Sequence, residues 1–256
     1  MAENDGLVEL AQAGKRAGFE GLFHAYAARV QGFALRMLAD ANGAQDVVVA
    51  AYKAVFREIV TFTSASGVLV KLYERAYAEC LRLAPAVSGG DPEWRDVDPD
   101  AVVDDGGLLA AMKGVSPCER GLWLLKLDGL ADVEVAFAAG MNVKSPDVGG
   151  QVTSAIGLAK RQFLAGLSTA PSTDAAKASE VADQLGLMLP SRPVPPQVWA
   201  TIDRTLRAER IVPDEAPEPR RSGGDTPFPW WILGALALAA GFLWIVLSMV
   251  GRFWRR

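Results

Sequence analysis

The sequence predicts an all-α protein with two small helical modules, an acidic linker between them and one transmembrane helix near its C-terminus. Three observations predict this fold class. Apolar side chains recur at helical spacings of three and four along most of the chain. A stretch rich in aspartate separates two such regions. A run of apolar residues at 230–250 is as long as a bilayer-spanning helix requires.

The composition argues against several classes of protein. The net charge of −4 gives no general attraction to nucleic acid, so DNA binding would need a local basic face. Two cysteines and a single histidine are too few for a structural zinc site or a disulfide framework. The sequence has no glycine-rich phosphate loop and no nucleophile motif, so we expect no enzyme and no metal or cofactor. Residues 1–16, expected to form an N-terminal tail, lack the apolar core of a signal peptide.

The first helical module is predicted at residues 17–83, with three or four helices. Its first helix carries one apolar stripe: Phe19, Leu22, Phe23, Tyr26, Val30, Phe33 and Met37. His24 lies within this helix and is expected to be a surface or packing residue. A break at residues 40–43 precedes a second helix at 44–60, and an amphipathic helix follows at 68–83.

An acidic, aperiodic segment at residues 84–106 is expected to be a flexible linker. Its carboxylates are Asp91, Glu93, Asp96, Asp98, Asp100, Asp104 and Asp105. A cluster of carboxylates could also bind a metal ion, but a solvated linker is the commoner explanation of such a charge run.

The second helical module is predicted at residues 107–168. Its expected helices are 108–113, 117–127, 131–139 and 148–167. Ser116, Pro117 and Glu119 have the residue types of a helix N-cap, first position and third position. Gly140 to Asn142 follows a short helix, as in the corner of a helix-turn-helix motif.

Residues 169–229 are expected to be a proline-rich juxtamembrane tether that holds two short helices, at 174–188 and 199–210. The apolar run comes next, as a transmembrane helix at residues 230–251, and a basic tail at 252–256 ends the chain.

The apolar run carries aromatic residues at both ends, as expected where a helix meets the two membrane interfaces: Trp230, Trp231, Phe253 and Trp254. Trp230 to Val250 would contact the lipid bilayer, and a buried core helix is the weaker alternative. The arginines after the run favour a cytoplasmic C-terminus. The lack of an export signal instead favours a cytoplasmic N-terminal part, which we adopt for a single-pass protein of the bacterial inner (cytoplasmic) membrane.

The first module resembles region 2 of the extracytoplasmic-function sigma factors, which belong to the sigma-70 family of bacterial RNA polymerase subunits. FEGLFHAY at residues 19–26 resembles the opening helix of that region. AQDVV at residues 44–48, followed by Tyr52 and Phe56, resembles its polymerase-clamping helix. LVKLYERA at residues 69–76 resembles the helix that reads the minus-ten promoter element.

The second module resembles region 4 of the same family. VSPCERGLWLL at residues 115–125 resembles its lead helix, and LADVEVAFAAGM at residues 130–141 resembles the first helix of its helix-turn-helix. The resemblance covers roughly residues 17–167 and consists of short motifs in the family's order, separated by an acidic linker.

The resemblance implies two sets of contacts. Contacts with core RNA polymerase, or with an anti-sigma or other regulatory protein, would use Asp46, Val47, Tyr52 and Phe56. Contacts with promoter DNA would use Lys71, Tyr73, Arg75, Lys144, Gln151, Thr153, Lys160 and Arg161. No catalytic residue is implied.

The sequence also departs from the family's pattern where DNA is read. Residues 147–157, at the position of the recognition helix, contain three glycines and no basic residue. The tryptophan that usually opens the minus-ten helix is absent. In addition, residues 187–202 followed by Trp230 and Trp231 resemble the juxtamembrane part of membrane-bound anti-sigma factors, although a generic proline-rich tether explains them equally well.

Three functions remain open from the sequence. The first is a membrane-tethered, sigma-like regulator of transcription initiation that binds RNA polymerase, promoter DNA or both. The second is a degenerate sigma-like adaptor that binds an anti-sigma factor or another protein at the membrane without reading DNA. The third is an unrelated helical scaffold anchored in the membrane.

Overall fold

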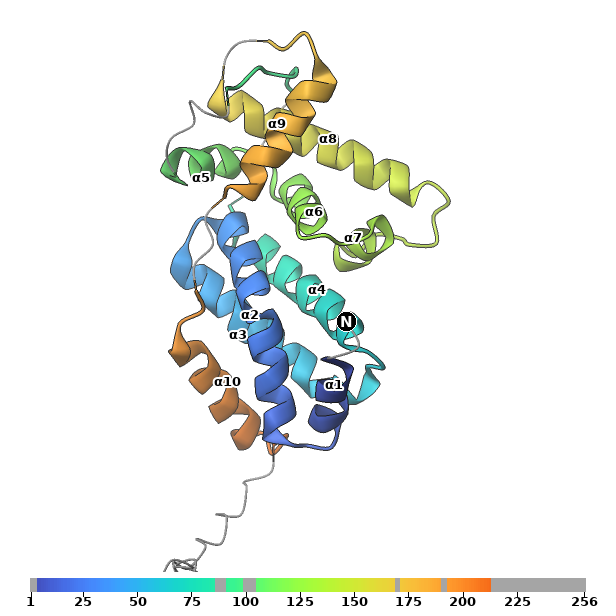
Figure 1. Ribbon diagram of the computed structural model, residues 1–256, viewed down its shortest axis with the longest axis vertical. Coiled ribbons are helices and arrows are strands. Elements are labelled where there is room, and N and C mark those ends of the chain that lie inside the picture. The colour runs from blue at the N-terminus through green and yellow to red at the C-terminus, as the bar shows by residue number, and fades with distance from the viewer. Residues whose placement is uncertain (1–3, 86–90, 99–104, 169–170, 190–192, 213–256) are drawn as a thin grey trace, which may run out of the picture. The chain divides into compact units, whose positions relative to one another are not determined.

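The structure is a computed structural model, and it describes residues 4–85, 91–98, 105–168, 171–189 and 193–212 (Figure 1). The chain divides into two units, residues 1–213 and 214–256, and every described residue lies in the first. The described part contains ten α-helices, one short 3₁₀ helix and no strand, which confirms the prediction of an all-α fold. The expected transmembrane helix lies outside the described residues.

Helices α2 (Arg16–Leu38), α3 (Ala41–Arg57) and α4 (Ala65–Leu83) pack against one another as a central group. Asp40 begins α3 by accepting hydrogen bonds from the backbone N–H groups of Asn42 and Gly43. The apolar stripe predicted for α2 is buried throughout. The core of this group therefore has the composition that the helical periodicity predicted.

The segment expected to be an N-terminal tail contains helix α1 (Asp5–Gln12), which packs on α2. Gly18 allows this close approach, because a Cβ atom there would lie 2.3 Å from the backbone nitrogen of Ala11. The Asp5 carboxylate accepts a hydrogen bond from the N–H of Ala65, at the start of α4. The helix is short and buries only Val8 and Ala11, so its periodicity gives little signal in the sequence.

A second group comprises five helices: α5 (Asp105–Lys113), α6 (Pro117–Leu127), α7 (Asp132–Ala138), α8 (Val148–Leu167) and α9 (Ala175–Leu187). The bounds of α6 and α8 are those expected from the sequence; α5 begins three residues earlier than expected, and α7 and α9 are each one residue shorter at both ends. Trp123 and Phe163 form its aromatic centre, with ring centroids 5.1 Å apart. This group meets the central helices where α6 packs on α2 and α7 packs on α4.

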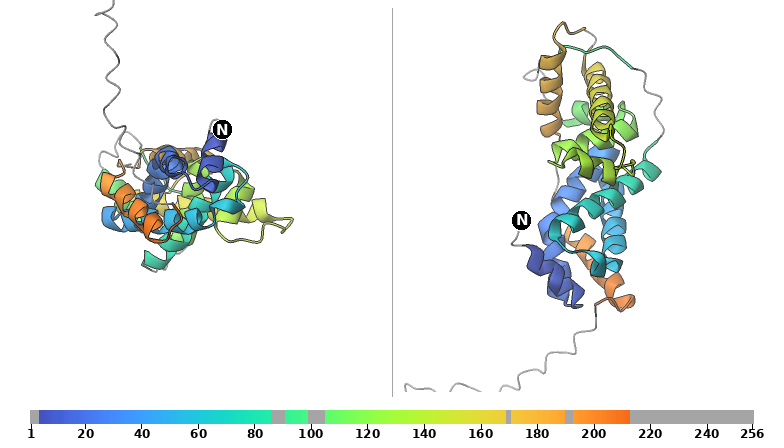
Figure 2. Two further views of the ribbon diagram at one scale, coloured as in Figure 1. Left: turned by 90° about the horizontal axis from the view of Figure 1, so that it is seen from below. Right: turned by 90° about the vertical axis from the view of Figure 1, so that its right-hand side faces the viewer.

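The last described helix, α10 (Pro196–Ala208), follows α9 in the chain but packs on α3 of the central group, as two views of the ribbon show (Figures 1 and 2). It begins three residues earlier than expected, with Pro196 at its first position. Residues 175–208, expected to belong to a tether, thus include two helices that pack on the rest of the chain. Among the described residues, no helix is both long enough and apolar enough to cross a membrane.

Candidate functional site

Helix α10 packs on α3 and also contacts α2 through Arg16 and Phe23. Three apolar side chains of α10 form a stripe along one side of the helix, because residues four positions apart share a helix face. Val198, Ile202 and Leu206 are all buried. We call the α2–α3 face beneath this stripe the docking groove.

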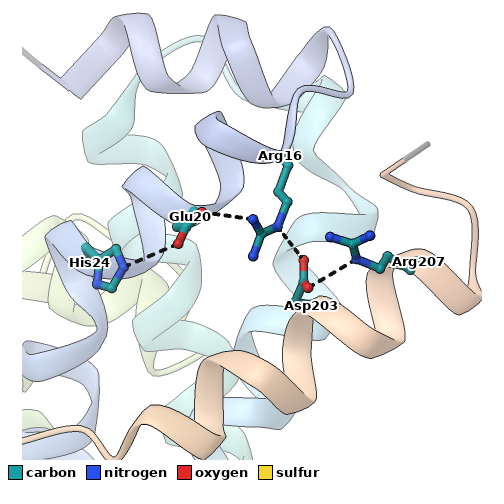
Figure 3. Close-up of polar contacts among 5 residues, drawn as sticks. All are labelled: Arg16, Glu20, His24, Asp203 and Arg207. Atoms are coloured by element: carbon teal, nitrogen blue, oxygen red, sulfur yellow. Dashed lines mark hydrogen bonds and ion pairs between the residues drawn. The ribbon is translucent and has the colours of Figure 1, made fainter. Parts of the chain in front are cut away.

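A row of ionisable side chains crosses from α2 to α10 along one edge of the docking groove (Figure 3). Asp203 of α10 accepts a hydrogen bond from Nε of Arg16 at 3.0 Å on one oxygen. Its other oxygen accepts one from Nε of Arg207 at 3.1 Å. On α2, Arg16 also lies 3.6 Å from Glu20, whose second oxygen is 3.9 Å from His24. Asp203 therefore joins α10 to α2 with both of its oxygens engaged.

A second ion pair joins the C-terminal end of α10 to α3. Arg57 donates from Nε to Oε2 of Glu209 at 2.7 Å, and its Nη2 contacts the other carboxylate oxygen. The hydrogen bond and the charge of Arg57 lower the pKa of Glu209, with a smaller contribution from Lys53. The docking groove thus presents cations to the acidic side chains of α10.

The N-terminal end of α10 packs less completely. Trp199 meets Phe23 of α2, with ring centroids 5.1 Å apart. A hollow of about 450 Å³ opens beside the two rings and is lined mainly by α2 and by residues 193–196. The indole Nε1 of Trp199 is buried and has no hydrogen-bond partner in the described part of the chain. An unmade hydrogen bond of this kind is costly to a folded structure.

The residues predicted to contact a polymerase or other partner differ in accessibility. Asp46 is exposed on α3. Val47, Tyr52 and Phe56 are fully buried, so contact through them would require the core to open. Tyr52 instead packs between the rings of Phe23 and Phe56. Burial also raises the pKa of Tyr52 well above its ordinary value.

The residues of α4 predicted to read DNA all have partners within the chain. Lys71 pairs with Glu74 at 2.7 Å, and its Nζ lies 5.8 Å from the ring centroid of Phe137 on α7. Arg75 pairs with Glu58 at 2.8 Å.

Tyr73, the third of these residues, is fully buried. Its hydroxyl donates to Asp128, which follows α6, and Arg29 lies over its ring. Burial raises the pKa of Tyr73, with a smaller contribution from the nearby charge of Asp128. The tyrosine therefore faces the second helical group.

The predicted DNA contacts of the second group are divided between paired and exposed residues. Lys160 donates to Asp183 of α9 at 2.6 Å and to Ser179 at 3.0 Å. Arg161 donates to Asp91 at 2.8 Å and lies over the ring of Trp94. The remaining three are exposed: Lys144, Gln151 and Thr153.

The connection between α7 and α8 differs from a compact helix-turn-helix corner. It runs from residue 139 to residue 147, whereas such a corner typically has three or four residues. Gly140 takes a φ of +69°, as the first turn of this connection requires. The loop is long because Asn142 to Asp147 forms two further turns before α8 begins.

The comparisons with known proteins add no family to this picture. No family model matches the chain. No curated protein and no solved structure matches it either. The resemblance to sigma factors therefore rests on the short motifs of the sequence alone.

Several residues of the site could not be found from the sequence. Arg16 and Asp203 pair across 187 positions, and neither belongs to a recognisable motif. The sequence predicted a helix at residues 199–210, but not the surface that it covers. Within the described ranges, no group of three or more His, Cys, Asp or Glu side chains is placed to hold a metal ion.

Proposed function

We propose that this chain is a membrane-tethered, sigma-like regulator of transcription that acts by binding a protein partner and does not itself read promoter DNA. The partner is core RNA polymerase or an anti-sigma protein. The sequence motifs support the sigma-like part of the proposal. The apolar run at residues 230–250 supports the tether.

One observation favours a protein over promoter DNA as the binding partner. The resemblance assigns five cationic residues to DNA, and four of them pair with a carboxylate of the same chain: Lys71, Arg75, Lys160 and Arg161. Most of the affinity of proteins for DNA comes from cations that neutralise phosphates. A cation whose charge is already balanced by a neighbouring carboxylate neutralises a phosphate less effectively, and therefore contributes less.

The first half of α8 supports the same choice. In a helix-turn-helix, the N-terminal residues of the recognition helix contact base edges. Residues 148–157 contain neither lysine nor arginine, and Gly149 and Gly150 have no side chain that could reach a base. Gln151 and Thr153 are exposed there, but two neutral side chains do not supply phosphate affinity.

The experiment that tests this function uses the full chain in detergent with purified core RNA polymerase and a promoter duplex. We expect the polymerase to be retained on the immobilised chain and run-off transcription to give no promoter-dependent product. Fluorescence anisotropy should give DNA binding no tighter than roughly 10⁻⁶ M at physiological salt, the range of non-specific binding. Promoter-dependent transcripts would establish a tethered initiator instead. Absence of retention would exclude polymerase and leave the anti-sigma protein as the partner to test.

A matched variant makes the DNA part of the test sharper. Glu58→Gln with Glu74→Gln removes the carboxylates from Arg75 and Lys71 without changing the size of either side chain. If these pairs limit DNA affinity, the variant binds DNA more tightly and its affinity falls more steeply with salt. An unchanged affinity would show that the pairs do not limit DNA binding.

A further inference from the structure

The docking groove has a chemistry that defines what binds it. Its apolar floor receives side chains spaced four residues apart on a helix, as Val198, Ile202 and Leu206 are. Its two edges carry Arg16 and Arg57, which bind carboxylates of the docked helix. The groove therefore selects an amphipathic helix with one apolar stripe and acidic side chains beside it.

The helix that now lies in the groove fits it imperfectly. The buried indole N–H of Trp199 has no acceptor in the described chain, and a hollow adjoins the rings of Trp199 and Phe23. The ion pair between Arg57 and Glu209 is largely exposed, and exposed pairs contribute little to stability. A helix that took the place of α10 without burying an unbonded N–H group would avoid this cost.

We infer that the docking groove of α2 and α3 is the surface that takes the protein partner, through an acidic amphipathic helix of that partner, and that α10 is its intramolecular competitor. This inference rests on the proposed function for the existence of a protein partner. The charge complementarity of Arg16 and Arg57 with Asp203 and Glu209 identifies the occupant as a helix with carboxylates beside an apolar stripe.

A labelled peptide with the sequence of residues 194–212 is the probe for the groove itself. In the full chain, Ile202→Glu places a charge in the apolar stripe and should displace α10. Ala208→Glu is the matched control, because it adds the same side chain on the exposed side of α10. We expect Ile202→Glu to bind the peptide at least tenfold more tightly than the wild type does, and Ala208→Glu to behave as the wild type. Equal binding by all three chains, or no binding by Ile202→Glu, would overturn the inference.

A milder opening variant guards against misfolding of Ile202→Glu. Asp203→Ala with Glu209→Ala removes both ion pairs and leaves the apolar stripe intact, and it should increase peptide binding in the same direction. A charge exchange then tests the contact directly. Arg57→Glu in the opened chain should weaken binding of the peptide, and a peptide carrying Glu209→Arg should restore it. No restoration would overturn the assignment of Arg57 to the occupant.

Retention of core RNA polymerase by the same three chains tests whether the docking groove binds the protein partner. We expect Ile202→Glu to retain at least threefold more polymerase than Ala208→Glu does, because the competitor has left the groove. Equal retention would place the partner elsewhere and overturn the inference, while leaving the proposed function intact. No retention by any chain would overturn polymerase as the partner. The peptide titration would still show whether the docking groove binds a helix in place of α10. A stable dimer of Ile202→Glu would assign the groove to a second copy of the chain instead.

Discussion

Tyr73 donates a hydrogen bond from its hydroxyl to Oδ2 of Asp128, with 2.9 Å between the two oxygens. The other carboxylate oxygen accepts from Nη2 of Arg36 at 2.5 Å, and the backbone oxygen of Asp128 accepts from Arg29 at 2.7 Å. One acidic residue after α6 thus contacts both α2 and α4. These hydrogen bonds join the second helical group to the central group.

The first prediction concerns this contact. Asp128→Ala should lower the free energy of unfolding by roughly 3 kcal/mol, because it leaves the largely buried Arg36 without its carboxylate. Asp132→Ala is the matched control, since Asp132 forms an exposed pair with Lys126 and should change the free energy by less than about 1 kcal/mol. Urea denaturation of both variants measures the difference. Equal effects would mean that Asp128 does not hold the two groups together.

Local patterns in the sequence predicted the helices better than their packing. The bounds of α6 and α8 are the expected ones because both depend on near neighbours: Ser116 and Pro117 begin α6, and α8 carries a regular apolar periodicity. The short α1 was missed because it buries only two side chains, too few to show a helical periodicity in the sequence. Helix positions follow from periodicity only where an element is long enough to repeat it.

The candidate site could not be predicted, because its decisive partners are far apart in the chain. Asp128 is 92 positions from Arg36, and Asp203 is 187 from Arg16. Each of these acids is one among 30 acidic residues in the sequence, and nothing local distinguishes it. The resemblance did single out Tyr73, but it assigned this residue to DNA, whereas burial places it in contact with Asp128.

The second prediction concerns Arg120 of α6, which is only 2% exposed. Its Nε has no hydrogen-bond partner in the described chain, and burial lowers its pKa to about 10, so it stays charged at neutral pH. Because burying a charged guanidinium with one N–H group unbonded is costly, Arg120→Met should raise the free energy of unfolding by roughly 1–3 kcal/mol. Arg36→Met should lower it, since Arg36 is buried with a carboxylate. Chemical denaturation of the two variants should therefore give opposite signs, and a loss of stability in both would contradict this account.

The third prediction is a pH dependence at the end of α10. Arg57 lowers the pKa of Glu209 below its ordinary value of 4.5. A carboxyl group with a lowered pKa in the folded state stabilises that state above its ordinary pKa, and the contribution is lost as the pH falls through the lowered value. The wild type should therefore melt at a higher temperature than Glu209→Gln at neutral pH. The difference should disappear in acid, and a difference that persisted there would exclude the ion pair as its cause.

The last prediction compares two glycines within helices. Gly121 of α6 faces Tyr77 of α4 so closely that a Cβ atom would lie 2.1 Å from the ring. Gly121→Ala should therefore force α6 away from α4 and lower the free energy of unfolding by roughly 1–3 kcal/mol. Gly157 of α8 has only an ordinary contact at 3.7 Å, so Gly157→Ala should raise the free energy by about 1 kcal/mol through helix propensity. Thermal denaturation followed by circular dichroism measures both changes. Stabilisation by Gly121→Ala would mean that α6 does not lie against Tyr77 in solution.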